Sequence, residues 1–122
     1  MKKILIVEDD ASITYLYEAV LIDYQLLIAK NDTEAFDLFY NHHPKVVLMD
    51  INLGANSLPG NEICKQMMAI APDTKVIAVS GNYEMLDPHY GTQNGFSQLI
   101  AKPIGFKELN RIVGEAFDEF GD

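Results

Sequence analysis

The chain has 122 residues, 48% of them hydrophobic and 22% charged, and a formal net charge of −9 at pH 7, as is typical of one globular domain. The negative charge disfavours direct binding to a nucleic-acid backbone or to an anionic membrane surface, and it suits a site that collects a divalent cation. One cysteine, Cys64, excludes an internal disulfide and no apolar run reaches membrane-spanning length, so we expect a cytoplasmic single domain over residues 1–122 without an output domain.

The N-terminal part of the chain alternates between short apolar runs and segments with helical spacing of apolar residues. Lys3 to Val7 predicts a buried strand, and the segment after it predicts an amphipathic helix capped by Asp10 or Ser12. Leu26 to Ala29 predicts a second strand, followed by a second helix that ends before Pro44.

The central apolar run, Val46 to Asp50, places four apolar residues directly before one carboxylate. An uninterrupted run this short predicts a strand buried on both faces, as in a parallel sheet covered by helices. Asn52 to Asn61 contains glycine and proline and predicts a loop, and Glu62 to Ala71 predicts a third helix. The residues of this helix expected to face inward are Ile63, Met67 and Ile70.

After the third helix the alternation continues. Val76 to Val79 predicts a fourth buried strand, which stops at Ser80. The alternation requires a helix within residues 82–94, but this segment has little apolar periodicity and contains Pro88 and Gly91. We therefore expect the fourth helix to be short, bent or partly irregular.

Leu99 to Ala101 predicts a short fifth strand, and a final helix follows it. The apolar residues at helical spacing in this helix are Phe106, Leu109, Ile112, Val113, Ala116 and Phe117. Five strands alternating with helices predict an α/β fold with a doubly wound, five-stranded parallel sheet and helices on both faces. The flavodoxin-like strand order 2-1-3-4-5 is one common arrangement of this kind.

Polar residues stand at the ends of four predicted strands. Glu8 and Asp9 follow the first strand, and Asp50 ends the third. Ser80 ends the fourth strand and Lys102 follows the fifth. The carboxyl ends of parallel strands lie at one edge of a sheet, and ligands bind beyond that edge. We therefore expect three carboxylates, a hydroxyl and an ammonium to lie close together.

Such a set of groups suits phosphoryl chemistry. Neighbouring carboxylates repel one another, and one takes up a proton unless a cation offsets the charge. Hard oxygen ligands favour Mg²⁺, which binds through one or two carboxylates plus a phosphate. Lys102 offers a compact positive charge to Asp50 or to a phosphoryl group on it, and the Ser80 hydroxyl offers a donor. Asp50 is therefore a candidate nucleophile that accepts a phosphoryl group.

The whole chain resembles the receiver domains of response regulators in two-component signalling. The segments Ile4–Asp10, Val47–Asp50 and Ala101–Pro103 carry the resemblance, in that order and each at a strand end. It implies that Asp50 takes a phosphoryl group, with Mg²⁺, from the phosphohistidine of a histidine kinase or phosphotransfer protein. The phosphorylated domain then changes its binding to a downstream target protein. Self-phosphorylation and autodephosphorylation at Asp50 are the only reactions implied, without turnover of external substrates.

The resemblance also implies a role for each residue at the strand ends. Glu8 and Asp9 correspond to the acidic pair of the family, with Asp9 nearest the metal. The backbone carbonyl of Asn52 joins Asp50 among the metal ligands. Ser80 and Lys102 take the positions of the hydroxyl residue and the lysine of the family, and the peptide bond from Lys102 to the following proline is often cis.

The sequence departs from the family at four places. Leu99 stands three residues before the lysine, where the family usually has a Tyr or Phe that acts as a rotating switch. The loop to Gly60 is longer than usual and lacks the usual proline, and Gly81 replaces an alanine and leaves access to the site open. Pro88 and Gly91 disturb the fourth helix, which with the fifth strand forms the usual signalling face. The alternative to signalling through this usual face is signalling through another face, or by the ordering of a loose segment on phosphorylation.

The sequence leaves three functions open. The first is a phosphoryl-accepting module, either a single-domain regulator or a relay intermediate. The second is a Mg²⁺-dependent phosphohydrolase, which commonly needs an acid two residues after the nucleophile, where this chain has Asn52. The third is a pseudo-receiver, an adaptor that binds partners without phosphorylation. The absence of the aromatic switch at Leu99 favours the adaptor hypothesis, and the complete set of acids, hydroxyl and lysine opposes it.

Overall fold

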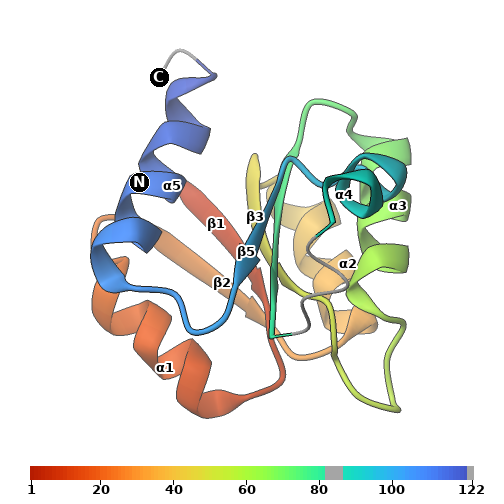
Figure 1. Cartoon of the computed structure of the whole chain (residues 1–122), viewed down its shortest axis with the longest axis horizontal. Helices are drawn as coiled ribbons and strands as arrows, with labels where there is room; N and C mark the ends of the chain where they lie inside the picture. The colour runs from red at the N-terminus through yellow and green to blue at the C-terminus, as the bar shows by residue number, and fades with distance from the viewer. Residues whose placement is uncertain (82–86, 121–122) are drawn as a thin grey trace.

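The computed structural model describes residues 1–81 and 87–120, which form a parallel sheet between two layers of helices (Figure 1). The strands are β1 (Lys3–Val7), β2 (Gln25–Ala29), β3 (Val46–Asp50), β4 (Lys75–Ser80) and β5 (Gln98–Ala101). The helices are α1 (Ala11–Val20), α2 (Asp32–His42), α3 (Gly60–Ile70), α4 (Pro88–Asn94) and α5 (Phe106–Asp118). The strand order is β2-β1-β3-β4-β5, so the predicted α/β fold and its topology are confirmed.

The two faces of the sheet bury separate apolar clusters. α2, α3 and α4 cover one face, and α1 and α5 cover the other (Figure 1). In β1, Leu5 and Val7 belong to the first cluster and Ile4 and Ile6 to the second. Because successive side chains of a strand point to opposite faces, a strand between two helix layers needs an uninterrupted apolar run. β3 is buried along its full length for the same reason.

Side-chain caps mark the starts of the first two helices, just after the carboxyl ends of the strands that precede them. The Asp10 carboxylate accepts the N–H of Ser12 at 2.9 Å, so Asp10 rather than Ser12 caps α1. The Asn31 side chain caps α2 by accepting the N–H of Glu34 at 2.9 Å. Both caps satisfy N–H groups that have no partner within the helix, and they fix the points at which the chain leaves the sheet edge.

The predicted start of α3 is wrong by two residues, because the helix begins at Gly60 rather than at Glu62. The cause is tertiary. A Cβ atom on Gly60 would lie 2.3 Å from the backbone oxygen of Asp50 and 2.9 Å from the Cα of Ile51. Only a glycine permits this approach, which seats the first turn of α3 directly against the end of β3.

The inward faces of α3 and α5 differ in part from the prediction. Ile70, expected to face inward, is 49% exposed, and Cys64 is fully buried beside Ile63. Phe106 is 56% exposed, so the apolar stripe of α5 begins at Leu109. No helix in the described part of the chain is long and apolar enough to cross a membrane.

α4 has seven residues and begins with Pro88, where a missing N–H removes no hydrogen bond from the helix. Asp87 caps the helix by accepting the N–H of His89. The helix is therefore short, as predicted, but Pro88 starts it rather than bending it. Gly91 lies against β5, since a Cβ there would be 3.2 Å from the Leu99 side chain. The predicted helix also included residues 82–86, which lie outside the described residues.

We predict that Gly60→Ala lowers the free energy of unfolding by roughly 1–3 kcal/mol, because the added Cβ meets backbone atoms that cannot easily move. Gly114→Ala, in α5, is the matched control. Its Cβ meets nothing within 4 Å, and alanine should stabilise the helix by about 0.5–1 kcal/mol. Urea denaturation of both variants measures the difference. Equal stability of the two would contradict the close approach at Gly60.

Candidate functional site

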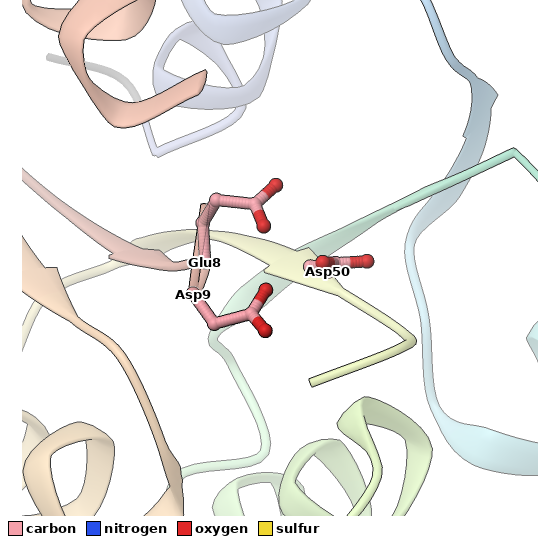
Figure 2. A group of neighbouring side chains, drawn as sticks. All are labelled: Glu8, Asp9 and Asp50. Atoms are coloured by element: carbon pink, nitrogen blue, oxygen red, sulfur yellow. The ribbon is translucent and has the colours of Figure 1, made fainter. Parts of the chain in front are cut away.

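Three carboxylates lie together at the carboxyl edge of the sheet. Glu8 and Asp9 directly follow β1, and Asp50 is the last residue of β3. Val7 pairs with Met49, so the next residues along these parallel strands, Glu8 and Asp50, leave the sheet side by side. One carboxylate oxygen from each acid lies within 4.8 Å of the others, and Figure 2 shows Glu8 and Asp9 extending toward Asp50.

The three acids differ in exposure and in their partners. Glu8 and Asp50 are only 2% and 6% exposed, whereas Asp9 is exposed. Both oxygens of Glu8 accept hydrogen bonds, Oε1 from the Lys102 ammonium at 3.1 Å and Oε2 from the Asp10 N–H at 3.3 Å. Asp9 therefore forms the solvent side of the cluster, which is the side open to an ion.

Lys102 supplies the positive charge at this edge. Its Nζ lies 3.1 Å from Oε1 of Glu8 and 3.4 Å from Oδ2 of Asp50. Its backbone N–H donates to the carbonyl oxygen of Ser80 at 2.9 Å, which continues the pairing of β4 with β5. The Lys102–Pro103 peptide bond is cis, as the resemblance implied. One ammonium thus contacts two of the three acids.

Ser80 and Asn52 lie at the same edge. Ser80 is fully buried and stands one residue beyond Val79, which pairs with Asp50. Asn52 is exposed, and its backbone N–H donates to Oδ1 of Asp50 at 3.1 Å. All residues predicted for the site therefore lie at one sheet edge. A hydroxyl donor at Ser80 and a carbonyl ligand at Asn52 stay predictions.

Burial and a like charge disturb the protonation of Glu8. Burial, a hydrogen bond with Asp50 and the charge of Asp50 raise the pKa of Glu8 from 4.5 to about 7, against the lowering effect of Lys102. Burial alone would lower the pKa of Lys102, but its hydrogen bond with Glu8 and the charge of Asp50 outweigh burial and raise that pKa. Lys102 thus stays a cation, and its single charge leaves the acids undercompensated.

Two features of this edge were missed from the sequence. Gly54 has a φ of 86°, and a Cβ there would lie 3.6 Å from Oδ2 of Asp9, so the loop backbone passes beside the acids. A glycine in the loop after β3 is the signal that could have indicated this approach. The same loop is bonded to the start of α2 through Asp32 and Ser57, which are 25 residues apart. No sequence motif indicates that contact.

We predict that the free energy of unfolding of the metal-free protein falls as the pH rises from 4.5 to about 7. In this range Glu8 still holds its proton in the folded chain but has lost it in the unfolded chain. The contribution of protonated Glu8 to stability is fully present below its usual pKa of 4.5, and it is lost as the pH rises through the raised pKa of about 7. Glu8→Gln should remove this part of the pH dependence. Denaturation in a metal chelator at several pH values tests it, with Glu18→Gln, at an exposed position of α1, as the control. The same slope in Glu8→Gln and the unaltered chain would refute it.

Comparison with known families agrees with this geometry. The family model of the response regulator receiver domain matches residues 4–114. The chain is 30% identical over 110 residues to the probable transcriptional regulator ycf27 of Porphyra purpurea, covering 88% of this chain and 44% of that protein. It is 33% identical over 125 residues to the transcriptional regulatory protein YxdJ of Bacillus subtilis (strain 168), covering 94% and 53%. The chain spans about half the length of these relatives.

A solved structure shares the fold over nearly its full length. The CheY-like response regulator receiver domain protein of Methanospirillum hungatei JF-1 has a TM-score of 0.88 to this structure at 27% sequence identity. The alignment covers 98% of this chain and 95% of that one. The family model, the strand order and the acidic edge lead to one assignment. The chain belongs to the response regulator receiver domains, the signalling domains of two-component systems.

Proposed function

We propose that the chain accepts a phosphoryl group on Asp50 from the phosphohistidine of a histidine kinase or phosphotransfer protein. A carboxylate oxygen bonds to phosphorus as the phosphorus–nitrogen bond breaks, and the departing imidazole keeps the electron pair of that bond. The observation that carries the proposal is the placement of Lys102, with its Nζ 3.4 Å from Asp50, at the edge where three acids meet. An ammonium there stabilises negative charge on the group being transferred.

The same edge suits Mg²⁺. Its donors are carboxylate oxygens from Glu8, Asp9 and Asp50, and oxygen is the ligand atom that Mg²⁺ prefers. Asp9 and Asp50, with the backbone carbonyl of Asn52, would hold the ion, and Glu8 would support it from the buried side. When bound, the ion supplies positive charge that offsets both the clustered acids and the oxygens of the phosphoryl group.

Lys102 and Ser80 would carry the phosphorylation signal away from Asp50. Before transfer, the Lys102 ammonium is shared between Glu8 and Asp50. A phosphoryl group on Asp50 brings stronger negative charge, which draws the ammonium away from Glu8, while the Ser80 hydroxyl donates to a phosphoryl oxygen. The backbones of Lys102 and Ser80 are hydrogen-bonded to each other, so the ends of β4 and β5 respond together. Phosphorylation then shifts the balance between two conformations, and a downstream target protein binds one of them better.

The phosphohydrolase alternative has less support from the residues beside Asp50. Two positions after Asp50 stands Asn52, whose side-chain amide offers no acidic proton to a leaving group. The adaptor alternative needs no chemistry, yet at this edge the three acids lie within 4.8 Å of one another and the Lys102 ammonium contacts Glu8 and Asp50. A non-reacting adaptor has no need of this costly gathering of buried charge.

We predict that Asp50→Asn abolishes labelling by a small phosphodonor such as phosphoramidate with Mg²⁺, because the amide cannot attack phosphorus as the carboxylate does. Asp23→Asn, at an exposed position in the loop between α1 and β2, should label fully. Intact-mass spectrometry detects the added phosphoryl group. Full labelling of Asp50→Asn would count decisively against the proposal. No labelling of the unaltered chain, despite Mg²⁺ binding, would favour the adaptor. Many turnovers of a phosphomonoester would favour the phosphohydrolase.

We predict that Lys102→Ala keeps the fold and accepts the phosphoryl group more slowly, because the ammonium that stabilises the transferred charge is gone, and that the phosphorylated variant loses its response because no ammonium moves. The measurement is the change in amide hydrogen exchange on adding beryllofluoride with Mg²⁺, compared with Lys107→Ala at an exposed position of α5. The unaltered chain and Lys107→Ala should show altered exchange beyond β4 and β5. A normal response in Lys102→Ala would remove Lys102 from the signalling path.

A further inference from the structure

The edge of the sheet opposite the acids carries two adjoining hollows, at the amino ends of the strands, from which the arrows of Figure 1 point away. The first has a volume of about 370 Å³ and lies between the ends of α2 and α3, where Tyr40 and Ile70 line it. The second has a volume of about 270 Å³ and lies beside the start of β1, where Lys3 lines it. Residues 43–45, which lead from α2 into β3, line both hollows. We name the two hollows and this shared segment the amino-edge surface.

The hollow beside β1 gathers basic side chains on a chain that is otherwise acidic. Three of the nine Lys and Arg residues and two of the three histidines line it, namely Lys2, Lys3, Lys45, His42 and His43. None of the described residues that line it is an Asp or Glu. Since the formal net charge of the chain is −9, an acidic partner that the molecule as a whole repels is attracted at this place.

A ring contact and a hydrogen bond hold two of these lysines in place. The Nζ of Lys45 lies 4.9 Å from the centre of the Phe120 ring, and the Nζ of Lys3 lies 3.3 Å from Nδ1 of His42. An ammonium only donates, so Nδ1 of His42 accepts this bond. Neither lysine has a carboxylate within ion-pair distance in residues 1–81 and 87–120. An aromatic ring and a neutral imidazole leave the charge of an ammonium in place, so both charges stay available to a partner.

Exposed apolar side chains border the hollow between α2 and α3. Tyr40 is 53% exposed, and Ile70, which the helix pattern of α3 placed inward, is 49% exposed. The buried ring of Phe39 lines the same hollow. Large apolar residues that gather exposed at a hollow are typical of binding surfaces, whereas scattered ones are ordinary. Asp73 also lines this hollow, so the acids of a partner belong beside the lysines and its apolar side chain belongs here.

We propose that the amino-edge surface binds a short acidic segment of a partner protein, in which a bulky apolar side chain stands beside Asp or Glu residues. The apolar side chain enters the hollow between α2 and α3, and the carboxylates lie over Lys3 and Lys45. One short segment reaches both hollows, because residues 43–45 line both. Pro44 is buried and its ring fixes its own φ, so this divider is formed before the partner arrives. The inference goes beyond the proposed function, since this edge does not include Asp50.

The apolar hollow favours a protein segment over other anions. Inorganic phosphate satisfies the lysines but has no apolar part that could fill the hollow. A nucleic acid carries charge along its whole length and is repelled by the net charge of −9. A short protein segment carries only a few charges and can place an aliphatic side chain next to them. It therefore matches both halves of the amino-edge surface.

A synthetic peptide with one leucine between glutamates, blocked at both ends, is the probe. Titrated into the isotope-labelled chain, it should shift the amide resonances of His43, Lys45 and Ala71 most, and its dissociation constant should rise with added NaCl. Lys45→Gln and Ile70→Ser should each raise the dissociation constant about two- to fivefold, because one removes an exposed charge and the other an apolar contact.

Matched control variants separate this surface from general effects of charge and hydrophobicity. Lys107→Gln, at an exposed position of α5, and Ile22→Ser, at a position that is 71% exposed, should bind the peptide as the unaltered chain does. Equal affinities of Lys45→Gln and Lys107→Gln, or of Ile70→Ser and Ile22→Ser, would overturn the proposal. Asp50→Asn should also bind the peptide normally, so a failure of phosphoryl labelling would leave this inference standing.

Further probes test the chemistry of the partner. Peptides with glutamine in place of glutamate, or with serine in place of leucine, should each bind more weakly. Equal binding of the serine peptide, or equal shifts with inorganic phosphate, would show a surface that accepts any anion and would overturn the proposal. The same resonances shifting when the chain alone is concentrated would assign the surface to a second copy and would also overturn it. So would the absence of any shift at millimolar concentrations of the leucine peptide.

Discussion

Repulsion among Glu8, Asp9 and Asp50 is the constraint on which this edge of the molecule depends. Two of these acids are buried, where water screens charge least, and Lys102 is the ammonium that contacts them. Burial, with the hydrogen bond and the charge of Asp50, raises the pKa of Glu8 against the lowering effect of Lys102. The apolar core on both faces of the sheet holds the strand ends in place against the repulsion. Any positive charge that enters this edge therefore stabilises it.

Strand register brings the reactive groups together, although they are far apart along the chain. Asp50 pairs with Val79 and Ser80 with Ala101, so the polar positions of neighbouring strands fall at one level of the sheet. Because successive side chains face opposite ways, a slip of one residue would exchange the two apolar faces of a strand. Packing of the two helix layers therefore fixes the register, and the register fixes the site.

The fold, and the gathering of four polar side chains at one sheet edge, could be predicted because their signals are local. Each buried strand is a short apolar run, and Glu8, Asp50, Ser80 and Lys102 stand where such runs end. Contacts between distant segments leave no comparable signal. α3 starts at Gly60 because its backbone meets that of Asp50, and Pro59 before it provides no side-chain cap. The bond between Asp32 and Ser57 joins two ordinary polar residues, so only the folded chain reveals it.

The close contact between α4 and β5 links the choice of residue at two positions. A Cβ on Gly91 would lie 3.2 Å from two carbons of the Leu99 side chain, so Leu99 packs closely against the helix at Gly91. In close packing, neither residue can become larger unless the other yields space or the helix withdraws. A larger aromatic ring at position 99 would compete with α4 for space. In the course of evolution, residues 91 and 99 are therefore expected to change together.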